Sequence, residues 1–84
     1  MKTKFKLRFT PSFLKRIKAL DRKFQVQILK EVNILKTTLY AGKPLHGEWK
    51  GIYSLRIGEY RILYQIKGNQ IILLVAGHRK RVYG

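Results

Sequence analysis

The segment from residue 52 to residue 76, IYSLRIGEYRILYQIKGNQIILLVA, decides the fold because it holds three strand-like runs separated by two glycine-containing turns. The runs Ile52–Ile57, Tyr60–Ile66 and Gln70–Ala76 are rich in aliphatic and aromatic residues, which are typical of β-strands. Gly58 stands first in a two-residue connection, the place that a type II′ hairpin turn gives to glycine. The segment therefore predicts an antiparallel meander. Its last strand is apolar on both faces, which favours an interior place in the sheet.

Two arginines lie at equal distances from the first turn. If Gly58 and Glu59 are the turn residues, Arg56 pairs with Arg61. The predicted core face then carries Tyr53, Leu55, Ile57, Tyr60, Ile62, Tyr64 and Ile66, and the other face carries Ile52, Ser54, Arg56, Arg61, Leu63 and Gln65. Like charges placed directly opposite destabilise a sheet by roughly 0.2–1 kcal/mol. Either the pair reflects chance in a basic protein or it straddles an anion, because guanidinium groups make bidentate contacts to phosphate.

The first half of the chain predicts one strand and two helices. Phe5, Leu7 and Phe9 alternate with cations, which indicates an edge strand with one buried face. Thr10 and the proline after it provide a helix cap and a first helical residue. The first helix is predicted to end near Leu20, and its apolar residues at helical spacing are Phe13, Leu14, Ile17 and Leu20. A second helix is predicted to begin after the cap Asp21, with apolar residues at Phe24, Ile28, Val32, Leu35 and Leu39. A loop over residues 40–51 follows. The order β-α-α-β-β-β predicts an α+β fold, with a helix hairpin packed on one face of a small antiparallel sheet.

Composition limits the chain to one small, basic domain spanning residues 1–84. Its 19 lysines and arginines against 4 acidic residues give a net charge of +15. This charge favours a nucleic acid as partner over an acidic membrane surface or an acidic protein. With no cysteine and two histidines, we expect neither a metal site nor a cofactor. No apolar run is long enough for a membrane span and the N-terminus lacks the apolar core of a signal peptide, so we expect a cytoplasmic protein with no membrane contact.

The C-terminal segment GHRKRVYG offers further chemistry. The strand register, continued past the second turn, predicts Ala76 opposite Arg61, which leaves space beside that arginine. After Gly77, we expect four side chains near the rim of the sheet face that carries Arg61, namely those of His78, Arg79, Arg81 and Tyr83. Histidine carries protons near neutral pH, arginine stabilises an oxyanion, and tyrosine stacks on a base or donates a proton. The alternative interpretation is a frayed basic tail.

Two segments resemble the RelE/ParE superfamily of toxins from toxin–antitoxin systems. PLHGEWKGIYSLRIGEYRILYQI resembles the strand pair L-x-G-x-x-x-G-x-Y-x-L-R-x-G-x-Y-R-x-x-Y, and AGHRKRVY is similar to the ending G-H-R-x-x-V-Y. The resemblance to RelE implies a microbial RNase fold and a toxin that enters the ribosomal A site and cuts mRNA. The resemblance implies a cut in which the ribose 2′-hydroxyl attacks the adjacent phosphate without a metal and leaves a 2′,3′-cyclic phosphate. It also implies a cognate antitoxin with an acidic, amphipathic segment and a toxin that is monomeric by itself.

The resemblance assigns roles to individual residues. Arg61 and Arg79 match phosphate-stabilising arginines, and Tyr83 matches a catalytic tyrosine. The predicted catalytic residues are Arg61, Arg79, Tyr83 and His78, and the predicted RNA or phosphate contacts are Arg56, Lys50, Lys80 and Arg81.

This chain departs from the pattern at two positions, because Ile52 and Ser54 stand where RelE-type sites carry lysines on the strand before the turn. The general base is therefore unassigned, and the candidates are His78 and Tyr83 acting with Arg79. The same departure leaves open a slower nuclease and the ParE branch, which binds DNA gyrase and breaks no bond. A non-toxic nucleic-acid-binding module is a third alternative.

Overall fold

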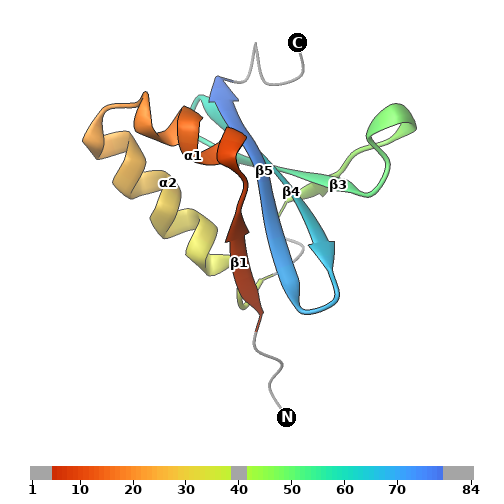
Figure 1. Ribbon diagram of the computed structural model, residues 1–84. Helices are drawn as coiled ribbons and strands as arrows, with labels where there is room; N and C mark the ends of the chain where they lie inside the picture. Colours follow the sequence, from red (N-terminus) through yellow and green to blue (C-terminus); the bar gives the residue numbers. More distant parts are fainter. Residues whose placement is uncertain (1–4, 39–41, 79–84) are drawn as a thin grey trace.

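The computed structural model describes residues 5–38 and 42–78, and within these ranges two helices cover one side of a five-stranded sheet (Figure 1). The elements, in chain order, are β1 (Lys6–Phe9), α1 (Pro11–Lys18), α2 (Arg22–Ile34), β2 (Lys43–Pro44), a 3-10 turn (Gly47–Trp49), β3 (Ile52–Ile57), β4 (Tyr60–Lys67) and β5 (Gln70–His78). The predicted α+β class and the helix hairpin on one face are confirmed. Neither helix of the described ranges is long and apolar enough to cross a membrane.

The predicted hairpin between β3 and β4 is confirmed residue by residue. Arg56 pairs with Arg61, and Ser54 pairs with Leu63. Gly58 has a φ of 60°, and no other residue type in the described ranges has a positive φ, which is the signature of a type II′ turn. Strands β4 and β5 extend to Lys67 and His78, beyond the predicted ends at residues 66 and 76.

The sheet order is β1-β5-β4-β3-β2. The interior place predicted for β5 and the edge place predicted for β1 are both confirmed. The sheet is mostly antiparallel, in line with the prediction, and within the described ranges β1 departs from it by running parallel to β5. The short strand β2 was not expected, and it forms the opposite edge by pairing Lys43 with Ser54 and Pro44 with Tyr53. The helix hairpin carries the chain from one edge of the sheet to the other.

A β-bulge interrupts the pairing of β4 with β5. Leu63 faces Val75 but Tyr64 faces Leu73, so Leu74 is an extra residue on β5. The predicted position of Ala76 opposite Arg61 is therefore wrong. Beyond the bulge, Ala76 pairs with Ile62, and the position opposite Arg61 belongs to the next residue, a glycine. Because side chains alternate along a strand, the extra residue exchanges the faces of every residue that follows it.

The core lies between the helices and the inner face of the sheet. Its buried members are Phe13 and Ile17 of α1, Ile28 and Val32 of α2, Leu35 after α2, and Ile57, Ile62, Tyr64, Ile71, Leu73 and Ala76 of the sheet. The ring of Tyr64 stacks on that of Tyr53 at 5.4 Å between centroids. Its hydroxyl accepts the backbone N–H of Gly42 at 3.0 Å. A Cβ at Gly42 would lie 2.8 Å from that hydroxyl, so only glycine fits there.

Both helices end before their predicted limits. Helix α1 ends at Lys18, two residues before the predicted end, and α2 ends at Ile34 with buried Leu35 as its cap. The predicted last apolar residue of the second helix, Leu39, lies outside the described residues. Asp21 occupies the cap position of α2 but its side chain makes no capping hydrogen bond.

Thr10 joins β1, α1 and the bulge of β5. Its hydroxyl accepts the N–H of Phe13 at 3.2 Å, which confirms the predicted helix cap. The same hydroxyl lies 2.9 Å from the carbonyl oxygen of Leu73 and 2.8 Å from that of Leu74, so its one proton is shared between them. The backbone N–H of Thr10 donates to the Leu73 carbonyl at 3.2 Å. One side chain therefore supports the start of α1 and the irregular part of β5.

Replacing Thr10 with valine, which has nearly the same shape but no hydroxyl, should lower the free energy of unfolding by about 1–3 kcal/mol. The loss combines the missing helix cap with the missing hydroxyl donor to the Leu74 carbonyl, whereas the Leu73 carbonyl keeps the backbone N–H of residue 10. Urea denaturation checks this. Thr10→Ser should retain most of the stability, and Thr37→Val, at an exposed helix end, should change it by less than about 0.5 kcal/mol. Wild-type stability in Thr10→Val would show that the hydrogen bonds of this hydroxyl do not stabilise the fold.

Candidate functional site

The face of the sheet turned away from the helices carries the two arginines of the hairpin. Cross-strand partners share a face, so Arg56 and Arg61 lie on the same side as Ser54 and Leu63. Arg56 is exposed and Arg61 is half-buried. Ser54 and Leu63 are 4% and 1% exposed, so the surface between the arginines and the centre of the sheet is closely packed. The predicted grouping of both arginines on one face is confirmed.

A hydrogen bond to Ser54 orients the side chain of Arg61. The Nη1 of Arg61 donates to the Ser54 Oγ at 3.2 Å. Ser54 lies two residues farther from the turn than Arg56, so this bond draws the guanidinium group away from the like charge directly opposite. A guanidinium group has five N–H donors, and one bond to a neutral hydroxyl leaves its charge and most of its donors available to a ligand. The arrangement suits the binding of an anion.

Gly77 is the cross-strand neighbour of Arg61 on β5. It contributes no side chain beside the guanidinium group, so the space expected from Ala76 is provided by the residue after it. The five strands contain no aspartate or glutamate. The nearest carboxylates in sequence are Glu48, before β3, and Glu59, in the turn. The strand residues themselves therefore give this face a positive potential.

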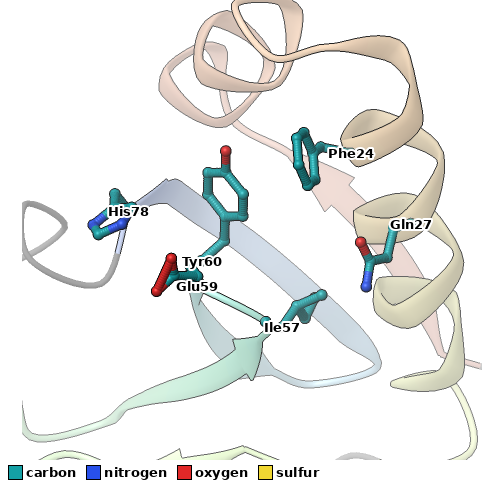
Figure 2. A pocket seen from close by; sticks show the side chains of 7 residues that line it. Phe24, Gln27, Ile57, Glu59, Tyr60 and His78 are labelled. Atoms are coloured by element: carbon teal, nitrogen blue, oxygen red, sulfur yellow. The ribbon is translucent and has the colours of Figure 1, made fainter.

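His78 lies on the other face of the sheet, toward the helices. It pairs with Tyr60, and the two rings meet edge-on at 6.2 Å between centroids. Phe24 of α2 packs against Tyr60 at 5.4 Å. These side chains line a pocket of about 260 Å³ together with Gln27, Ile57, Gly58 and Glu59. Figure 2 shows His78, Tyr60 and Phe24 around it. The prediction that His78 shares a rim with Arg61 is wrong, because the bulge in β5 reverses the faces beyond it.

The described ranges test part of the predicted site. They bring together Arg61 and Arg56, and they place Lys50 on the exposed segment just before β3. The remaining predicted residues, Arg79, Lys80, Arg81 and Tyr83, lie outside the described residues. Sequence reasoning treated Ser54 only as a missing lysine and did not identify it as the partner of Arg61. The predicted register already placed both side chains on one face, so this contact could have been inferred.

Comparisons with known proteins identify the family of this chain and solved structures with a similar fold. Residues 7–83 match the family described as ParE toxin of the type II toxin–antitoxin system, parDE. Toxin RelG of Mycobacterium tuberculosis is 36% identical over 53 residues, and the match covers 61% of this chain and 61% of that relative.

Three solved structures show the similarity of fold. The RelBE2 toxin–antitoxin complex from Mycobacterium tuberculosis contains a chain with a TM-score of 0.82 and 26% identity, covering 94% of this chain and 95% of that one. A chain of the chromosomal ParDE system from P. aeruginosa has a TM-score of 0.77 and 16% sequence identity, and the match covers 92% of this chain and 98% of that one. A chain of the RelB–RelE complex from Methanococcus jannaschii has a TM-score of 0.73 and 23% sequence identity, and the match covers 90% of this chain and 94% of that one.

If Ser54 holds Arg61 ready for an anion, Ser54→Ala should weaken binding of a short single-stranded RNA by roughly two- to tenfold, since the arginine must then be ordered on binding. Fluorescence anisotropy at fixed salt concentration checks this. Ser12→Ala, which removes an exposed hydroxyl from α1, should leave the affinity unchanged. Wild-type affinity in Ser54→Ala, together with a loss in Arg61→Ala, would show that the arginine acts without this hydrogen bond.

Proposed function

We propose that this chain, which belongs to the ParE toxin family within the RelE/ParE superfamily of type II toxin–antitoxin toxins, is a toxin that cleaves mRNA on the ribosome. The observation that carries the proposal is the Arg61 guanidinium group, which is held by Ser54 on a sheet face without strand carboxylates. A fixed cation of this kind suits the phosphate of an RNA backbone. The similarity to toxin RelG and to RelBE structures supports the RNA-directed branch.

The proposed reaction needs one bond to form as another breaks. The ribose 2′-oxygen attacks the adjacent phosphorus, and the bond from phosphorus to the 5′-oxygen breaks, which gives a 2′,3′-cyclic phosphate and a 5′-hydroxyl end. A base must remove the 2′ proton and an acid must protonate the leaving oxygen. Arg61 stabilises the extra negative charge on the phosphorane, and Arg56 contacts a neighbouring phosphate. Lys50, Lys80 and Arg81 bind the rest of the RNA or the ribosome.

For the proton transfers we retain Tyr83, acting with Arg79, as the general base. His78 is the less favoured candidate, because its ring lies beside Tyr60 on the face opposite Arg61. On this assignment His78 supports the end of β5 and the turn instead of reacting. The proposal also includes a cognate antitoxin, as in the toxin–antitoxin complexes of similar fold, and a cytoplasmic toxin that is monomeric by itself.

The second candidate function is inhibition of DNA gyrase without any nuclease activity. The family match to ParE toxins favours it, and the resemblance places gyrase binding in that branch. The absence of lysines at Ile52 and Ser54, where RelE-type sites carry them, points in the same direction. The two functions differ in target, so one comparison separates them.

The purified toxin should cut mRNA on programmed ribosomes, with fragments ending in a 2′,3′-cyclic phosphate. Arg61→Ala should slow this cleavage by about 10²-fold, since loss of one preorganised donor to a developing oxyanion typically costs that much. Primer extension maps the cuts. Arg22→Ala, which removes an exposed arginine from α2, serves as the charge-matched control. Inhibited gyrase supercoiling without any cleavage would replace this proposal with the second candidate.

The two candidate bases make different predictions. Tyr83→Phe should slow cleavage by about 10²–10⁴-fold, the usual contribution of a general acid or base. His78→Gln should have a smaller effect on cleavage, because this side chain lies on the other side of the sheet from Arg61. Single-turnover cleavage on programmed ribosomes measures both rates. The reverse order of effects would assign the base to His78.

A further inference from the structure

The edge strand β2 places one more cation on the arginine face. Lys43 pairs with Ser54 in the antiparallel ladder between β2 and β3. Residues directly opposite in such a ladder point to the same face of the sheet. Lys43 therefore belongs to the face of Ser54 and Arg61, although its strand has only two residues and no sequence pattern predicts it.

We propose that Lys43 is a phosphate-contacting residue of this toxin, which binds the RNA backbone beside Arg61. The inference rests on the proposed function, since it names a further contact for the same substrate. RelE-type sites carry lysines on the strand that corresponds to β3, where this chain has the uncharged Ile52 and Ser54. In this chain, Lys43 supplies a positive charge from β2 instead.

The position of Ser54 between two cations supports this assignment. From one side, the Arg61 guanidinium group reaches the Ser54 Oγ at 3.2 Å. On the other side of Ser54, Lys43 is its partner in the β2–β3 ladder. Because adjacent strands lie about 4.7–4.9 Å apart, the Lys43 backbone is close to Ser54. A lysine side chain has a four-carbon stem with a compact charge at its end. An anion above Ser54 is therefore within reach of both cations.

Three contacts hold Lys43 in register. The residue before it, Gly42, is buried and donates its N–H to the Tyr64 hydroxyl at 3.0 Å. Pro44, after it, pairs with Tyr53, and the Leu45 N–H donates to the Ile52 carbonyl at 2.8 Å. The backbone is thus fixed on both sides, while the Lys43 side chain itself is exposed. This combination fixes the backbone of the residue and leaves its charge exposed to a ligand.

The chemistry of the two cations favours a polyanion as ligand. Arginine binds phosphate through paired N–H donors, whereas lysine contributes a point charge that tolerates several geometries. No carboxylate lies in any strand of this sheet. Each phosphate of single-stranded nucleic acid that a protein neutralises adds about 0.7 to the slope of log K against log salt. A contribution from Lys43 is therefore measurable.

The test compares Lys43→Ala, Lys43→Arg and a control, Lys30→Ala, which removes an exposed lysine from α2 on the other side of the sheet. The probe is a short single-stranded RNA with 2′-O-methyl groups, which cannot be cut by 2′-hydroxyl attack. Lys43→Ala should lower the salt slope by about 0.7 and slow cleavage on ribosomes by about fivefold or more, with no change in melting temperature. Lys43→Arg should keep the wild-type slope, and Lys30→Ala should change neither quantity. Adding Ile52→Lys to Lys43→Ala should restore the slope, because this lysine returns a cation to the same face.

Each result decides the inference separately from the proposed function. If Lys43→Ala behaves like Lys30→Ala in both assays while the wild type cleaves, Lys43 makes no phosphate contact and the nuclease proposal stands. If the wild type does not cleave, the nuclease proposal fails, and the salt slope alone decides whether Lys43 binds the RNA backbone.

Discussion

The hydroxyl of Thr10 lies where the end of β1, the first turn of α1 and the bulge of β5 meet. It accepts the Phe13 N–H and approaches the carbonyl oxygens of Leu73 and Leu74, more than sixty residues away in the chain. Consecutive carbonyl groups in a regular strand point to opposite sides, so a single donor reaches both only where the strand is irregular. The same side chain thus caps the first helix of the hairpin and donates a hydrogen bond to the carbonyl groups at the bulge of β5.

The bulge determines which residues of β5 serve the core and which serve the surface. Beyond Leu74, Ala76 enters the core, Gly77 lies beside Arg61, and His78 turns toward Tyr60. Without the extra residue, these assignments would be exchanged and Arg61 would have a histidine or an alanine on its side of the sheet. The bulge therefore leaves open space at the arginine and moves the imidazole to the hollow under α2.

The electrostatics of the arginine face depend on how Arg61 is held. A carboxylate partner would orient the guanidinium group but would also cancel its charge, whereas the Ser54 hydroxyl orients it and leaves the charge in place. With a net charge of +15, the protein has no shortage of cations. What distinguishes this face is that Arg61 is positioned, that Arg56 lies directly opposite it on β3, and that Lys43 on the edge strand β2 shares the same face. A positioned cation is better suited than a mobile one to stabilising charge that develops during a reaction.

The sequence by itself determined the features that depend on local interactions. Gly58 set the turn, and with it the pairing of Arg56 with Arg61, while Thr10 and the proline after it set the start of α1. The alternation of apolar residues in β4 identified its core face, because a strand with one buried face carries a period-two signal.

Only the tertiary structure decided the features that depend on distant partners. The run IILLVA suits both faces at every position, so its pattern cannot locate an extra residue, and the bulge follows from contacts with Thr10 and β4. The strand β2 is too short to have a period, and it exists through its pairing with β3. The parallel alignment of β1 with β5 likewise arises from a long-range ladder. The sequence therefore identified the catalytic arginine candidate on the sheet. The tertiary structure decided that Ser54 is its hydrogen-bond partner, that Lys43 shares its face of the sheet, and that His78 does not.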